Sequence, residues 1–76
     1  MLRNEEKAVL EAAMARLSPG DREILWLREF DERSVGDTAE LLSMRPEAVR
    51  QRHSRAVRRL GVLYRELESQ NEAPRR

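Results

Sequence analysis

Residues 34–60 read SVGDTAELLSMRPEAVRQRHSRAVRRL, with two helix-start signals twelve positions apart, at Ser34 and Pro46. Ser34 is followed by Asp37 three residues later, a capping arrangement that predicts a short helix over residues 35–42. Proline suits the first position of a second helix, because the backbone N–H that it lacks is unpaired there anyway. A short helix, a three-residue turn and a second helix form the arrangement of a helix-turn-helix DNA reader.

The helix that begins at Pro46 separates its side chains by character. At about 100° per residue, one side collects the mostly apolar set Val49, His53, Ala56, Val57, Leu60 and Tyr64. The opposite side collects the polar set Glu47, Arg50, Gln51, Ser54, Arg55 and Arg58. Arg52 and Arg59 fall at the boundary between the two sides. Residues 50–59 hold five Arg and no acidic residue, a bias of sign that an ordinary solvated face does not require.

These residue types match the chemistry of a DNA duplex. Arg and Gln recognise the edges of guanine and adenine in the major groove, and Arg also binds phosphate. Residues near the start of a recognition helix reach the bases, while later ones meet the backbone. We therefore expect base contacts from Glu47, Arg50, Gln51 and Ser54. We expect phosphate contacts from Arg45, Arg55, Arg58 and Arg59.

The charge of the chain supports a nucleic-acid partner once it is divided by position. The net charge is only +1. Residues 1–42 carry six basic and ten acidic side chains, a net charge of −4, whereas residues 43–76 carry nine Arg and four Glu, a net charge of +5. This asymmetry indicates that the second half of the chain binds a polyanion.

The rest of the chain reads as helices without a strand signal. We expect a first helix from about Glu5 to Leu17, capped by Asn4, and a second helix from Pro19 through Phe30, started by Ser18. The fourth helix has one weak point, Gly61. Two further expectations are that Trp26 lies in the core and that His53 is a packed core residue. The predicted fold is an all-α, four-helix domain over residues 1–69, followed by a mobile tail over residues 70–76.

Length, composition and motif content argue against several function classes. With 76 residues it holds one small domain, with little room for a large enzyme cleft. The longest apolar run has four residues, 24–27, too short for a membrane span or a signal-peptide core. There is no Cys, which excludes disulfides and thiolate metal sites. No phosphate-binding loop, HExxH motif or nucleophile elbow is present. We expect a cytoplasmic protein that is not an enzyme and has no cofactor or metal.

The motifs resemble region four of bacterial sigma factors, of the extracytoplasmic-function type, from about Ala8 to Leu60. The residues that carry the resemblance are Leu17-Ser18-Pro19, residues 22–30 (REILWLREF), Ser34, Ala39, Leu41-Leu42, Val49-Arg50-Gln51-Arg52 and Arg55-Ala56. The nearest competitor is the LuxR-type DNA-binding domain, which the sequence Leu60-Gly61-Val62 resembles. The spacing of twelve residues from Arg22 to Ser34 fits the sigma pattern better.

The resemblance implies recognition of the promoter −35 element, with DNA contacts at Arg50, Gln51, Arg52 and Arg55. It implies two further partners: the β-subunit flap of RNA polymerase, held by apolar surface, and an anti-sigma factor. The alternative is a protein-interaction module that binds polymerase or an anti-sigma factor and contacts DNA only weakly. Nothing resembles the sigma region for the −10 element, so this chain alone is not expected to melt a promoter. It departs from the family pattern at Thr38 (usually Ile), Ser43 (usually Gly) and Ala48 (usually Thr).

Overall fold

The computed structural model of the protein describes residues 2–71. This part of the chain forms four α-helices and a π-helical segment, in the order α1 (Asn4–Arg16), α2 (Pro19–Leu25), η1 (Trp26–Phe30), α3 (Val35–Leu42) and α4 (Pro46–Asn71). No strand occurs between residues 2 and 71, so the expected all-α fold is confirmed. In the same range, no helix has the length and apolar character that crossing a bilayer requires.

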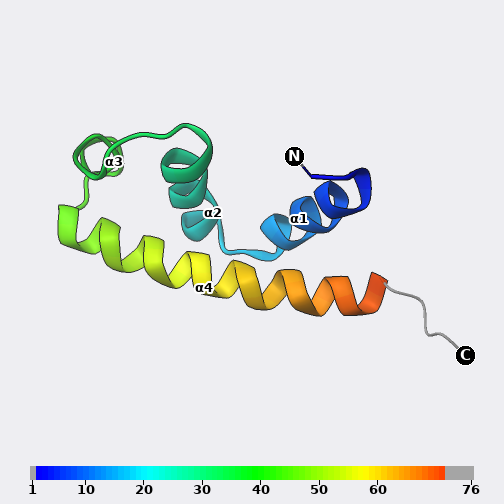
Figure 1. Ribbon diagram of the computed structural model, residues 1–76. Coiled ribbons are helices and arrows are strands. Elements are labelled where there is room, and N and C mark those ends of the chain that lie inside the picture. Colours follow the sequence, from blue (N-terminus) through cyan, green and yellow to red (C-terminus); the bar gives the residue numbers. More distant parts are fainter. Residues whose placement is uncertain (1, 72–76) are drawn as a thin grey trace, which may run out of the picture.

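The long helix α4 supports the other three. α3 lies over its N-terminal end, α2 over its middle and α1 over its C-terminal half (Figure 1). All three pack against α4. One face of α4 is therefore covered along most of its length, and its remaining surface is available for other contacts.

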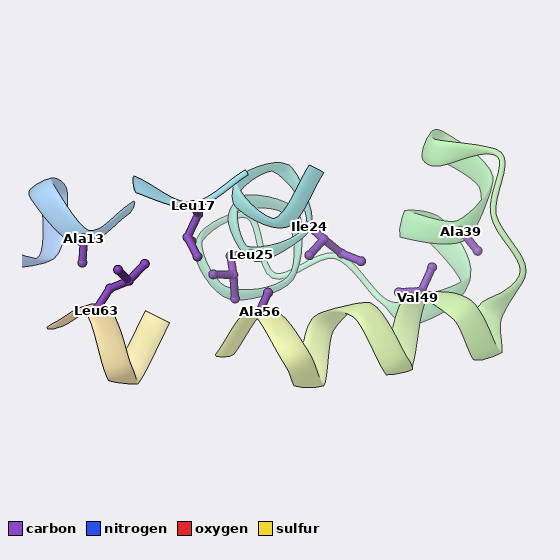
Figure 2. Packing of buried hydrophobic residues seen from close by; sticks show 8 residues of the cluster. All are labelled: Ala13, Leu17, Ile24, Leu25, Ala39, Val49, Ala56 and Leu63. Atoms are coloured by element: carbon purple, nitrogen blue, oxygen red, sulfur yellow. The ribbon is translucent and has the colours of Figure 1, made fainter. Parts of the chain in front are cut away.

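The buried side chains form a line along α4. At one end Ala39 of α3 and Val49 of α4 are buried, and at the other Ala13 and Leu63 are buried (Figure 2). Between them lies a central group that belongs to α2, the connection before it and α4, and that consists of Leu17, Ile24, Leu25 and Ala56. Each Å² of apolar area removed from water contributes about 25 cal/mol, so this line of side chains stabilises the packing of the other helices on α4.

Three helix starts agree with the sequence, at Ser18, Ser34 and Pro46, and one does not. Ser18 Oγ accepts a hydrogen bond from the backbone N–H of Asp21 at 3.3 Å, and Ser34 Oγ accepts one from that of Asp37 at 2.9 Å. The prediction that Asn4 caps the first helix is wrong. Asn4 already lies in the helix, and the residue before it is the N-cap.

The second predicted helix differs from the expectation in two ways. Its last turn, residues 26–30, has π-helical rather than α-helical geometry. Trp26 is 57% exposed, so its expected place in the core is wrong. Consecutive helical residues point about 100° apart, so the apolar run of residues 24–27 surrounds the whole helix and only part of it can face α4. Ile24 and Leu25 occupy the buried positions.

The fourth helix is longer and less interrupted than expected. It continues through Gly61 without a break and ends at Asn71. Val57, placed on the apolar side by the sequence, is 45% exposed, because the covered face of α4 is narrower than the expected arc. Of the expected tail over residues 70–76, the first two residues belong to α4, and residues 72–76 lie outside the described part of the chain.

Candidate nucleic-acid interface

The turn between α3 and α4 has a left-handed residue at its centre. Ser43 has φ 54° and ψ 47°, a conformation in which glycine is usual. The backbone N–H of Met44 donates to the carbonyl oxygen of Ala39 at 2.9 Å, which closes the end of α3. The chain then enters α4, where the N–H of Val49 donates to the carbonyl oxygen of Arg45 at 3.0 Å. The three-residue turn predicted from the sequence is thus a well-bonded helix-turn-helix connection.

Packing of α3 on α4 determines which side of α4 faces solvent. Thr38 and Ala39 of α3 and Val49 of α4 are all buried. The side of α4 opposite Val49 is left exposed. This side carries six of the predicted DNA-contacting residues, all of them exposed: Glu47, Arg50, Gln51, Ser54, Arg55 and Arg58. A seventh, Arg45, is exposed in the turn before α4. Arg59, from the boundary of the predicted polar side, is exposed as well.

Four of these side chains converge on one shallow hollow. Gln51, Ser54, Arg55 and Arg58 line a hollow of about 260 Å³ in the surface of α4. Arg55 and Arg58 also line a neighbouring hollow of about 230 Å³ together with Arg59. Val62 completes the lining of the second hollow, so the middle of α4 presents a largely polar and basic surface.

The positive charge of this surface is not neutralised locally. Among the described side chains, no carboxylate lies within 4.0 Å of the basic nitrogens of Arg45, Arg50, Arg55, Arg58 or Arg59. Glu47 is the one acidic residue close to them in sequence, in the first turn of α4, where the helix dipole favours negative charge. Such a surface attracts phosphate groups by releasing counterions from DNA.

Arg52 lies apart from the other predicted contacts. Its side chain is half-buried. A Cβ atom added at Gly20 would lie 3.0 Å from Nη1 of Arg52, so the guanidinium group packs against the first turn of α2. The structure therefore does not bring Arg52 together with the exposed arginines.

A model of the sigma-70 region 4 family matches residues 7–60. The chain belongs to this family. It is therefore a sigma-factor domain for DNA binding and promoter recognition, associated with RNA polymerase, and its family is not an enzyme family. The match favours the sigma interpretation over the LuxR-type alternative and is consistent with the extracytoplasmic-function type. No curated protein and no solved structure matches the chain significantly.

Sequence reasoning missed a second surface of this sigma-type domain, an aromatic groove. Trp26 and Phe30 of η1 are 57% and 50% exposed, and their ring centroids lie 5.0 Å apart. They line a groove of about 500 Å³ between α1 and the α2–η1 segment, together with Leu2, Lys7, Leu10, Glu11, Met14, Ala15 and Arg22. The spacing of four residues between the two aromatics was the available signal, since such residues share one side of a helical turn.

His53 was expected to be a packed core residue and is instead half-buried and hydrogen-bonded. Its Nε2 lies 2.8 Å from Oε2 of Glu29 in η1. Among the described residues, no group of three or more His, Cys, Asp or Glu side chains is arranged to hold a metal ion.

Proposed function

We propose that this domain reads the −35 element of a promoter through α4. The observation that carries the proposal is the exposed side of α4 opposite Val49, where unneutralised arginines surround Gln51 and Ser54. A helix fits the major groove of B-form DNA, and a basic side facing outward is what the groove requires. This function places the protein in the cytoplasm.

The position of each residue along α4 suggests a division of roles. Glu47, Arg50, Gln51 and Ser54 lie in the first turns of the recognition helix and are proposed to face base edges. Arg45, Arg55, Arg58 and Arg59 are proposed to hold phosphates on either side. Arg52, which the resemblance adds to the DNA contacts, is proposed to make the smallest contribution, because its guanidinium group rests on Gly20.

Selection of duplexes from a random pool at a fixed salt concentration tests this proposal. The full chain is expected to enrich one short motif. Gln51→Ala should relax the preference at one position of that motif while the other positions persist, since a residue that reads a base controls only that base. Failure of the wild-type chain to enrich any motif would overturn sequence-specific recognition.

We further propose that the aromatic groove holds the flap of the polymerase β-subunit. Exposed Trp26 and Phe30 give the groove the large apolar anchors that dominate protein interfaces. Trp26→Ala should therefore weaken binding to an isolated flap domain at least tenfold. Leu41→Ala, which removes a side chain that is 56% exposed in α3, is the matched control and should leave binding unchanged. Equal effects of the two substitutions would contradict the assignment.

The protein-interaction alternative uses the same groove. An anti-sigma factor that covers Trp26 would compete with the flap for the domain. This alternative predicts binding at the groove without an enriched duplex motif. Competition between a candidate anti-sigma protein and the flap domain, measured beside the duplex selection, separates the two functions.

A further inference from the structure

A side-chain hydrogen bond joins η1 to the recognition helix. Oε2 of Glu29 and Nε2 of His53 are 2.8 Å apart, between residues 24 positions apart in the chain. An ionised carboxylate only accepts hydrogen bonds, so Nε2 of His53 carries the proton. The His53 side chain is 22% exposed and that of Glu29 is 54% exposed. The bond is therefore a direct and partly desolvated link between two helical segments.

The same short segment also presents the aromatic groove. Trp26 and Phe30 lie in η1 and line the groove, whereas Glu29, the neighbour of Phe30 in the chain, reaches α4. Single π-helical turns inside helices occur often at functional sites. Here one such turn of five residues contributes to both candidate surfaces of the domain.

The end of η1 is held by backbone hydrogen bonds. The N–H of Asp31 donates to the carbonyl oxygen of Trp26 at 2.9 Å, and the N–H of Arg33 donates to that of Leu27 at 2.8 Å. These bonds connect the residues on both sides of Glu29 within one turn. A displacement of Trp26 is therefore expected to move Glu29 with it.

His53 lies in the same turns of α4 as the proposed base contacts, but on the side that faces the core. It follows Arg50 by three positions and precedes Arg55 by two. Residues three apart on a helix are neighbours on its surface, so a contact at His53 fixes the position of the helical turn that carries Arg50. The bond to Glu29 thus acts on the DNA-reading turn from the side of the core.

We propose that Glu29 is a positioning residue for DNA recognition, which holds α4 through His53 and couples the aromatic groove to the DNA-reading surface. This inference rests on the proposed function and adds a link between its two surfaces. Coupling of this kind is reciprocal, so DNA bound to α4 changes the affinity of the groove for its occupant by the same factor as that occupant changes DNA affinity. Because the Glu29–His53 pair is partly exposed, we expect its loss to change DNA affinity by a factor of about two to five.

Duplex affinity of Glu29 variants tests the positioning role. We expect Glu29→Ala to weaken binding of the enriched duplex about two- to fivefold, measured by fluorescence anisotropy of the labelled DNA. Glu29→Gln should restore wild-type affinity, because its amide oxygen still accepts from His53. Glu23→Ala removes an exposed carboxylate of α2 and is the matched control. Loss of negative charge alone should leave DNA affinity unchanged or raise it. A lower DNA affinity of Glu29→Ala would therefore come from the lost hydrogen bond and not from the change in charge.

Fluorescence of Trp26 tests the coupling, because the chain has a single Trp. A saturating duplex should shift the emission of the wild-type chain and of Glu29→Gln, but not that of Glu29→Ala. His53→Ala removes the same bond from its other end and should reproduce the result of Glu29→Ala, with circular dichroism confirming that each variant is helical. Equal emission shifts in the wild type and both alanine variants, or no shift in the wild type, would overturn the proposal while duplex binding persists. A wild-type chain that binds no duplex would instead overturn the proposed function, and this proposal with it.

Discussion

Gly20 and Arg52 are in close contact where the start of α2 meets α4, so that a Cβ atom at Gly20 would lie 3.0 Å from Nη1 of Arg52. Because Gly20 has no side chain, the first turn of α2 leaves room for the guanidinium group of Arg52 from the recognition helix. An arginine that the family resemblance assigns to DNA is thereby directed toward the scaffold. The contact determines how substitutions at both positions should behave.

Alanine at two of the three helical glycines, Gly20 and Gly61, should have unequal effects on stability. Gly61→Ala should raise the free energy of unfolding by about 1 kcal/mol, because alanine favours a helix interior and the added Cβ meets only Arg65 Nη1 at 3.9 Å. Gly20→Ala should gain no more than about 0.5 kcal/mol, because the guanidinium of Arg52 must move. Chemical denaturation measures both. In an Arg52→Ala background, Gly20→Ala should gain the full amount of stability that Gly61→Ala gains, because the guanidinium group is no longer in the way. Equal gains from Gly20→Ala and Gly61→Ala in the wild-type chain would contradict this account.

Removal of the Thr38 hydroxyl group should stabilise the fold. The side chain is fully buried in α3, and its Oγ1 has no hydrogen-bond partner among the described residues. Thr38→Val keeps the shape and removes the unpaired polar atom, so the free energy of unfolding should rise by about 1 kcal/mol. Thr38→Ser keeps the hydroxyl, loses a methyl group and should be destabilised by about 1 kcal/mol. A less stable valine variant would mean that the hydroxyl is satisfied in solution.

The helix starts could be predicted from the sequence because they depend on neighbouring residues. Ser18 and Ser34 each bond a backbone N–H three positions on, and Pro46 needs no partner at all. The place of Trp26 could not be predicted in this way. Which members of an apolar run face α4 depends on helices distant in sequence, and a shift from α-helical to π-helical hydrogen bonding leaves no periodic pattern.

Glycine at Ser43 should stabilise the turn. A residue with a Cβ atom in the left-handed region, as at φ 54°, costs about 1 kcal/mol or more. Ser43→Gly should therefore raise the free energy of unfolding by about 1 kcal/mol. Ser34→Gly is the matched control, because Ser34 has φ −67° and caps α3 with its hydroxyl, and it should lose a few tenths of a kcal/mol, roughly. A loss of stability in both urea titrations would show that the left-handed conformation carries no penalty.

Tyr64 should ionise at a higher pH than an ordinary tyrosine. Burial raises the pKa of its phenol above the usual 10.0, and the carboxylates of Glu68 and Glu6 raise this pKa further. Glu68→Gln should lower the pKa without restoring the usual value, because burial remains. Glu66→Gln, two positions away on another side of α4, should leave it unchanged. Absorbance of the tyrosinate ion measures these pKa values directly, since the chain has one Tyr.

The same shift makes stability depend on pH in alkaline solution. The pKa of Tyr64 is higher in the folded than in the unfolded chain, so the folded state retains the proton over a wider range. This contribution to the free energy of unfolding is complete below pH 10, roughly the unfolded pKa, and is lost as the pH rises through the folded pKa. Tyr64→Phe should remove that part of the alkaline loss. An identical alkaline profile in the phenylalanine variant would contradict the raised pKa.

The candidate site could be predicted only where the helix alone decides it. The exposed side of α4 follows from the spacing of Val49 and Ala56 on one continuous helix. The bond between Glu29 and His53 joins residues 24 positions apart and depends on how η1 crosses α4, which no local pattern contains. The direction of Arg52 likewise depends on a neighbour in another helix.

Alanine substitutions along α4 should weaken DNA binding more at exposed arginines than at the half-buried Arg52. Arg50→Ala and Arg55→Ala should each weaken duplex binding by about 1 to 3 kcal/mol and reduce the slope of log affinity against log salt by about one. Arg52→Ala should have a smaller effect on both quantities, because its guanidinium group packs on Gly20 rather than facing outward. Arg16→Ala, an exposed arginine at the end of α1, is the control for net charge and should leave the salt slope unchanged. Anisotropy titrations at several salt concentrations give both quantities.

An effect of Arg52→Ala as large as that of Arg50→Ala would contradict this assignment. Arg52 would then have to leave Gly20 when DNA binds. Because Gly20→Ala disfavours the contact with Arg52, that substitution would in this case tighten duplex binding.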